Sequence, residues 1–200
     1  MKKVLVSLMV FVCTIAAFAA PGKSTARATQ QGTASTSVNF NGKKYYLQYS
    51  AGNSQQWLNE YLPAGATFNN YTEMIAVRSY DGIEATPEQI GTSIVSNLLN
   101  NYPDTPYNLV KGAHPGEVEV SFGIATASVD EFNLFRIVPG KNGHPIALQY
   151  VRRALLPSPD DPKWKEITDK FVYALQHDFD QWLQAIQTMP VPAINRTLKQ

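Results

Sequence analysis

The residues best suited to recognising a ligand are concentrated in one segment, residues 57–67. Trp57, Asn59, Glu60 and Tyr61 stand there just before a predicted turn. Aromatic rings supply contact area, while an amide and a carboxylate supply directional hydrogen bonds. Segments next to loops often carry function when a rigid scaffold holds them. The pattern therefore favours an edge strand that carries core aromatics, with a contact site for a ligand or a protein as the functional alternative.

Arginines on predicted strands offer a second kind of recognition. Arg78, Arg136, Arg152 and Arg153 all have this placement. A guanidinium there can receive a carboxylate or a phosphate in a forked hydrogen bond. We favour the simpler interpretation that one side chain of the adjacent pair Arg152-Arg153 points outward and protects a sheet edge by its charge. Arg78 is kept as a candidate binding residue.

The histidines do not have the spacing of a metal site. His114, His144 and His177 fall on three different predicted elements. The turn that holds His114 also holds Glu117, but two potential ligands are fewer than the three or four that a protein metal site needs. We therefore predict no metal and no cofactor, and His114 stays a candidate binding residue only.

No residue is predicted to be catalytic. The chain has no Gly-x-Ser-x-Gly elbow, no Walker pattern and no dinucleotide fingerprint. A Ser-His-Asp triad assembled from distant positions stays open. Glu117 and Glu119 are two residues apart and could flank a sugar as paired carboxylates. We favour the interpretation that they form the solvated face of a strand, because polar and apolar residues alternate there.

The first residues predict export. Two lysines are followed by an apolar run and by small residues at Ala17 and Ala19, the positions that a signal peptidase reads. Residues 1–19 are therefore predicted to be a cleavable signal peptide. The run is shorter than the roughly 20 residues of a membrane span, so we expect no span after cleavage. Residues 20–37 are rich in Ser, Thr, Ala, Gln and Gly and are predicted to be a flexible leader.

Composition narrows the function of the mature domain, residues 38–200. The chain has one cysteine, Cys13, and it lies in the predicted signal peptide. Disulfides and thiol catalysis are thereby excluded, and stability must come from a packed core. Loss of Lys2 and Lys3 leaves 15 basic and 16 acidic residues, a net charge of about −1. Without a basic excess, a nucleic-acid partner has no electrostatic support.

Seven or eight strands and two helices are predicted in residues 38–200. Asn41-Gly42 suits a hairpin turn, and further strands are expected over residues 56–63, 71–80, 107–111, 117–124, 131–138 and 146–155. A capping box at Thr86 begins a helix that ends at Pro103. An apolar stripe predicts a long helix that begins near Asp161 and ends at Met189.

The links between the later strands are too short for helical crossovers, so most strand pairs must be antiparallel. The predicted fold is α+β: a single mainly antiparallel sheet packed with a mid-chain helix and a long C-terminal helix. Because each helix has one apolar face to bury, the sheet is expected to collect the apolar residues of one domain.

Two resemblances accompany this order of elements. Residues 59–67, followed by residues 71–75, resemble the opening of small uncharacterised exported proteins of Gram-negative bacteria. Over most of the chain, the order of elements resembles the PsbP and Mog1-like α/β/α sandwiches. This resemblance implies a binding or accessory module more often than an enzyme, and it transfers no catalytic residue.

These observations predict a periplasmic or secreted protein that binds another envelope or secreted protein without catalysing a reaction. Its role would be that of an accessory factor or of an immunity-type protein. One alternative is a hydrolase of an envelope polymer that uses His114, Glu117 or Glu119. The other is a small-molecule carrier that holds its ligand between the sheet and the long helix.

Overall fold

The computed structural model describes residues 35–199. The predicted signal peptide, and the predicted leader as far as residue 34, lie outside the described residues. The elements in chain order are β1 (Ser37–Phe40), β2 (Lys43–Gly52), β3 (Trp57–Pro63), β4 (Glu73–Ser79), α1 (Pro87–Asn101), β5 (Tyr107–Lys111), β6 (Val118–Ala125), β7 (Val129–Pro139), β8 (Pro145–Leu155) and α2 (Lys163–Thr188).

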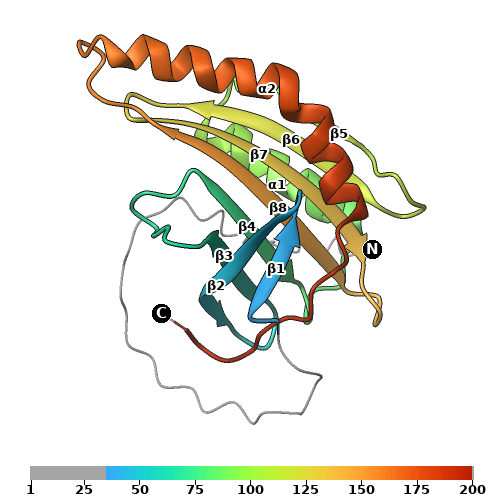
Figure 1. The fold of residues 1–200 in the computed structure, drawn as a ribbon. Helices are drawn as coiled ribbons and strands as arrows, with labels where there is room; N and C mark the ends of the chain where they lie inside the picture. Colours follow the sequence, from blue (N-terminus) through green and yellow to red (C-terminus); the bar gives the residue numbers. More distant parts are fainter. Residues whose placement is uncertain (1–34, 200) are drawn as a thin grey trace.

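All eight strands form one antiparallel sheet in the order β1-β2-β3-β4-β8-β7-β6-β5 (Figure 1). The order contains two meanders, β1 to β4 and β5 to β8, which α1 connects along the chain. They join where β4 pairs with β8 over seven residues, from Glu73 opposite Arg152 to Ser79 opposite Ile146. The predicted α+β fold with a single antiparallel sheet and two helices is confirmed.

Local sequence explains where these elements begin and end. Asn41 and Gly42 both have positive φ, as a two-residue hairpin turn requires. The capping box of α1 is present, with Thr86 Oγ1 accepting from the Gln89 backbone and Gln89 Oε1 accepting from the Thr86 backbone. At the start of α2, Pro162 occupies the N-cap position without a capping side chain, and Asp161 just before it accepts from the Lys163 backbone N–H through Oδ1 at 2.8 Å.

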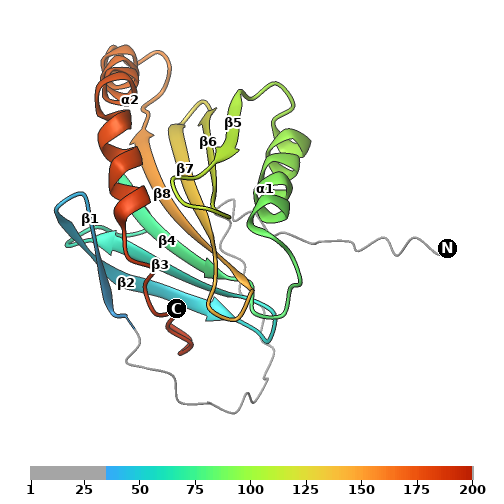
Figure 2. The ribbon, with the colours of Figure 1, turned by 90° about the vertical axis from the view of Figure 1, so that its right-hand side faces the viewer.

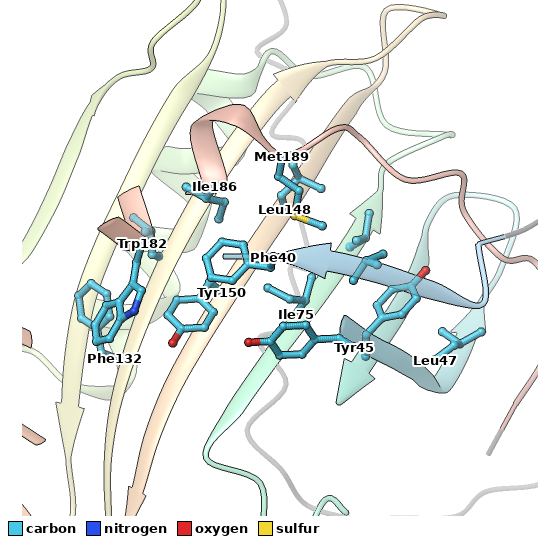
Figure 3. Close-up of a cluster of buried hydrophobic side chains, with 14 of the residues drawn as sticks. Phe40, Tyr45, Leu47, Ile75, Phe132, Leu148, Tyr150, Trp182, Ile186 and Met189 are labelled. Atoms are coloured by element: carbon cyan, nitrogen blue, oxygen red, sulfur yellow. The ribbon is translucent and has the colours of Figure 1, made fainter. Parts of the chain in front are cut away.

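The helices cover opposite faces of the sheet (Figure 2). On the face under α2, the β1–β2 hairpin curls inward, so that Phe40 stacks on Tyr150 of the central strand β8 with ring centroids 4.6 Å apart. The Trp182 ring of α2 lies beside Tyr150, with ring centroids 5.4 Å apart. Its centroid is 6.1 Å from that of Phe132 (Figure 3). The main core is therefore aromatic and joins both meanders to α2.

The opposite face carries a second core under α1. Ile90, Ile94 and Leu98 of the helix are buried against strands β6, β7 and β8. Gly91 permits this close approach, because a Cβ there would lie 2.9 Å from Leu109 Cδ1. The helix packs on β5 to β8 only, so it covers one half of this face.

Two predictions about sheet edges are wrong. The strand that begins at Trp57 lies between β2 and β4, and the strand that holds Arg152 and Arg153 lies between β4 and β7. Neither is an edge strand, because the pairing of β4 with β8 places both in the interior of the sheet. The two edges are β1 and β5.

The aromatic core provides a test of the fold. Replacing Trp182, which is 5% exposed, in the variant Trp182→Ala leaves a cavity between α2 and the sheet and should lower the free energy of unfolding by about 3–5 kcal/mol. Val172→Ala, at an exposed position of the same helix, should change it by no more than about 0.5 kcal/mol. Chemical denaturation measures both, and equal losses would contradict the packing described here.

Candidate functional site

The residues predicted to form one site are divided between two faces of the sheet. Side chains alternate across a strand, so Asn59 and Tyr61 of β3 point toward the α2 face, while Glu60 points toward the α1 face. Arg78 of β4 lies on the same face as Glu60, because Leu58 is its partner in register. His114 is exposed in the loop between β5 and β6.

Asn59 and Tyr61 hold the two ends of the described chain. Asn59 is fully buried; its Nδ2 donates to Ser50 Oγ at 2.9 Å and to the Asn195 carbonyl at 2.8 Å. Its Oδ1 accepts from the Asn195 backbone N–H at 2.6 Å. The Tyr61 hydroxyl donates to the Ser35 carbonyl at 3.2 Å, and burial raises the pKa of Tyr61 to about 12. Both side chains therefore anchor backbone segments.

Trp57 and His114 are placed apart from the other predicted residues. The Trp57 ring packs on the end of β2, where a Cβ at Gly52 would lie 2.5 Å from the ring. The carbonyl of His114 accepts from the Glu117 backbone N–H at 3.1 Å, which closes a surface turn. Of the predicted residues, the structure therefore brings only Glu60 and Arg78 together, on the part of the α1 face that the helix leaves uncovered.

Glu60 and Arg78 belong to a polar surface on the central strands, which we call the Glu60 patch. It consists of Glu60, Arg78, Asn133, Phe135 and Gln149, contributed by β3, β4, β7 and β8. Asn133 is buried and the other four are half-buried. The patch is bounded on one side by the core under α1 and on the other by a cluster that includes Ala66 and Phe68 of the β3–β4 loop.

Charge and amide groups order the Glu60 patch. Burial raises the pKa of Glu60, and the nearby positive charge of Arg78 opposes this shift. Gln149 Nε2 donates to Asn133 Oδ1 at 2.7 Å, and Asn133 Nδ2 donates to Glu131 Oε1 at 2.9 Å. The amides of Gln149 and Asn133 are thus held in place by hydrogen bonds, which preorganises this part of the patch for recognition.

The Glu60 patch is shallow. The hollow between Leu58, Arg78, Phe135 and Gln149 has a volume of about 10 Å³, close to that of a single water molecule. Small-molecule sites enclose roughly 300–1,000 Å³. The shape of the patch therefore suits a flat macromolecular surface better than a small ligand.

Glu117 and Glu119 are not on a solvated face, so that interpretation of the sequence is wrong. Arg136 donates a forked pair of hydrogen bonds to Glu117, from Nε to Oε2 at 3.0 Å and from Nη2 to Oε1 at 2.6 Å. Glu119 is also buried and accepts from Gln187 Nε2 at 2.9 Å. Polar and apolar residues do alternate along this strand, but the end of α2 lies against its polar side, which no local pattern could reveal.

Arg136 also reaches the end of α2. Its Nη1 donates to the carbonyls of Ile186 and Met189, at 3.2 and 2.9 Å. A cation at a helix C-terminus satisfies carbonyls that have no partner within the helix. The forked hydrogen bond that the sequence offered as an alternative thus exists for Arg136, and the remaining nitrogen of the same guanidinium attaches the end of α2 to the sheet.

A second charged cluster was missed in the sequence. Glu73, at the start of β4, accepts from Arg152 Nη1 at 3.0 Å and from the Tyr45 hydroxyl at 3.2 Å, and it pairs with Lys43. Burial and the charge of Glu73 raise the pKa values of Tyr45 and Tyr150. The members of this charged cluster come from β2, β4 and β8, so they are brought together only by the register of the sheet.

Within residues 35–199, no three His, Cys, Asp or Glu side chains gather as metal ligands would. The helices of the same range include none with the length and apolarity needed to cross a membrane.

Comparison with known proteins gives a family but no function. The model of one family, whose function is uncharacterised, matches residues 33–191. The chain belongs to this family. A comparison with curated proteins finds no significant match, and a comparison with solved structures finds none either. The match begins after the predicted signal peptide and covers all ten described helices and strands.

The raised pKa of Glu60, the half-buried carboxylate of the patch, predicts that the stability of the fold depends on pH. Because the pKa of Glu60 is raised above its ordinary value of 4.5, the folded chain binds this proton more tightly than the unfolded chain. Stability due to Glu60 should therefore rise as the pH falls from neutrality toward 4.5. As the pH is lowered over this range, the difference between the free energies of unfolding of the native chain and of Glu60→Gln should increase. A difference that stays constant with pH would contradict a raised pKa for Glu60.

The Glu117–Arg136 pair should matter far more than an exposed pair. Glu117→Gln leaves a buried guanidinium without its charge partner, so we expect a loss of about 3–5 kcal/mol in unfolding free energy. Asp169→Asn breaks the exposed pair with Lys165, whose side chains are 62% and 77% exposed, and should cost at most about 0.5 kcal/mol. Urea denaturation distinguishes them, and similar losses would exclude a structural role for the buried pair.

Proposed function

We propose that this chain is an exported binding or accessory protein of the bacterial envelope that recognises a partner protein without catalysing a reaction. An immunity-type role, in which the partner is a toxin, is one form of this proposal. The single observation that carries it is the Glu60 patch: a preformed polar face on the central strands that α1 leaves uncovered.

The chemistry of the patch suits a protein partner. Glu60 and Arg78 place opposite charges side by side, and Glu131 and Arg153 repeat that arrangement on neighbouring strands. Mixed charges on a flat surface contribute specificity and register more than they contribute bulk affinity. Phe135, half-buried at the border of the patch, where it stacks on Phe122, is an aromatic side chain of the kind enriched at interface centres.

The alternative functions have weaker support. The carboxylates that a polymer hydrolase would use, Glu117 and Glu119, are engaged by Arg136 and Gln187. The space that a carrier would use, between the sheet and α2, is occupied by Phe132, Phe179 and Trp182. We therefore rank the binding protein first.

The place of action is part of the same proposal. The two lysines, the apolar run and the small residues of the first 19 positions support export, and the lack of cysteine after Cys13 is compatible with any redox environment. The PsbP and Mog1-like resemblance supports an accessory module by analogy alone.

Site-specific photo-crosslinking tests the proposed function. A photoreactive residue at Gln149, within the patch, should give an adduct with one envelope protein in intact cells. The same residue at Gln176, on the exposed side of α2, should give none. Reversing the patch charges in Glu60→Lys/Arg78→Glu should abolish the adduct at position 149, because register at a flat interface depends on charge complementarity.

The melting temperature of the charge-reversed variant serves as its control. A chain that stays folded and loses the adduct supports the proposal. An identical adduct from both positions, or its persistence after charge reversal, would assign binding to another surface.

A further inference from the structure

The residues after α2 cross the sheet and reach its outer edge. We call residues 190–199 the C-terminal strap. In Figure 1 it descends from α2 and passes below β1 and β2. Its last described residue, Lys199, exchanges two backbone hydrogen bonds with Ser50 of β2, each 2.9 Å long. The strap therefore ends as a short antiparallel addition to the sheet.

The edge that the strap occupies is left free by β1. Strand β1 pairs with β2 only as far as Tyr46, whereas β2 continues to Gly52. The Leu47 N–H still donates to the Thr36 carbonyl at 2.9 Å, but the outer edge of residues 48–52 would otherwise present unpaired backbone groups, which readily accept another strand. Between this edge and the strap lies an open cleft of about 480 Å³, lined by residues that include Tyr46, Gln48 and Leu198.

Asn59 holds the strap by its backbone. The side-chain amide of Asn59 donates to the Asn195 carbonyl and accepts from the Asn195 N–H, at 2.8 and 2.6 Å. This two-bond pairing uses groups that every residue except proline possesses. Asn59 does not recognise the Asn195 side chain, whose Oδ1 accepts from the Thr197 N–H within the strap. Asn59 thus recognises an extended backbone of almost any sequence.

The side chains of the strap form few buried apolar contacts, although Arg196 Nη1 pairs with Asp81 Oδ2 at 2.7 Å and Lys199 Nζ donates to the Leu47 carbonyl. Ile194 packs against the main core, but residues 196–199 are exposed, including Leu198 at 63%. Segments with few buried apolar contacts are the first to open in a native protein. Departure of the strap would leave the fully buried amide of Asn59 without two partners, so an equivalent backbone is needed in its place.

We propose that the outer edge of β2 and Asn59 form an acceptor site for an extended segment of a partner polypeptide, which the strap occupies when no partner is bound. The segment would pair with β2 by strand addition. The segment would carry an aliphatic residue in the place of Ile194, immediately before the residue whose backbone is hydrogen-bonded to Asn59. This site lies on the α2 face and the β2 edge, so it does not depend on the Glu60 patch.

The test keeps the whole chain and frees only the strap. A site for a sequence-specific protease is inserted between Pro190 and Val191, both exposed, and the folded protein is cut there. A fluorescent peptide with the sequence of residues 190–199 is then added. We expect saturable binding to the cut chain by anisotropy, and binding at least about 100-fold weaker to the uncut chain, whose tethered strap competes at high effective concentration.

Peptide variants distinguish backbone recognition from side-chain recognition. Asn195→Ser keeps an acceptor for the turn at Thr197 and should bind within about threefold of the parent peptide, whereas N-methylation of the residue 195 amide should weaken binding at least about tenfold. Ile194→Asp should also lose binding, because it places a charge in the core.

Four results would overturn the proposal. The cut chain could fail to exchange its strap, or it could unfold on cutting, as circular dichroism would show. Equal losses for the Asn195→Ser and N-methyl peptides would exclude reading of the backbone. A dimer of the uncut chain in sedimentation, dissociated by excess peptide, would assign the site to a second copy of this chain.

Discussion

The pairing of β4 with β8 is the contact on which the rest of the structure depends. It joins two meanders that are separate along the chain, and it places four interior strands, β3, β4, β8 and β7, at the centre of one sheet. Loop-closure entropy opposes such a non-local pairing, so it must be stabilised by what packs on it. The aromatic group of Phe40, Tyr150 and Trp182 does this, since it takes one ring from each meander and one from α2.

The same pairing determines where polar groups are placed. Glu73 meets Arg152 across β4 and β8, and Arg136 is positioned on β7 to receive Glu117 and the last carbonyls of α2. On the other face, it aligns the strands that carry the Glu60 patch. Stability and the proposed recognition patch therefore share one scaffold, with the buried Glu117–Arg136 pair and the half-buried Glu73–Arg152 pair on the α2 face, and the half-buried charges of the Glu60 patch on the face that α1 leaves partly open.

Adjacent residues on one strand have acquired different roles. Asn59 and Tyr61 hold backbone from the two ends of the described chain, whereas Glu60, between them, contributes to an open surface. This alternation accounts for the two separate surfaces that we propose for recognition. One is the Glu60 patch, and the other is the outer edge of β2, where the C-terminal strap covers Asn59.

The sequence by itself determined the local elements. The Asn41-Gly42 turn, the Thr86 capping box and the stripe of α2 depend on neighbours within a few residues, so they were predictable, as was the single antiparallel sheet. Tertiary structure alone decided which strands are interior, that α2 buries Glu117 and Glu119, and that Asn59 and Glu60 face opposite ways in different surroundings. Those outcomes depend on strand order and on which layer covers each face, and both are set by contacts between residues far apart in the chain.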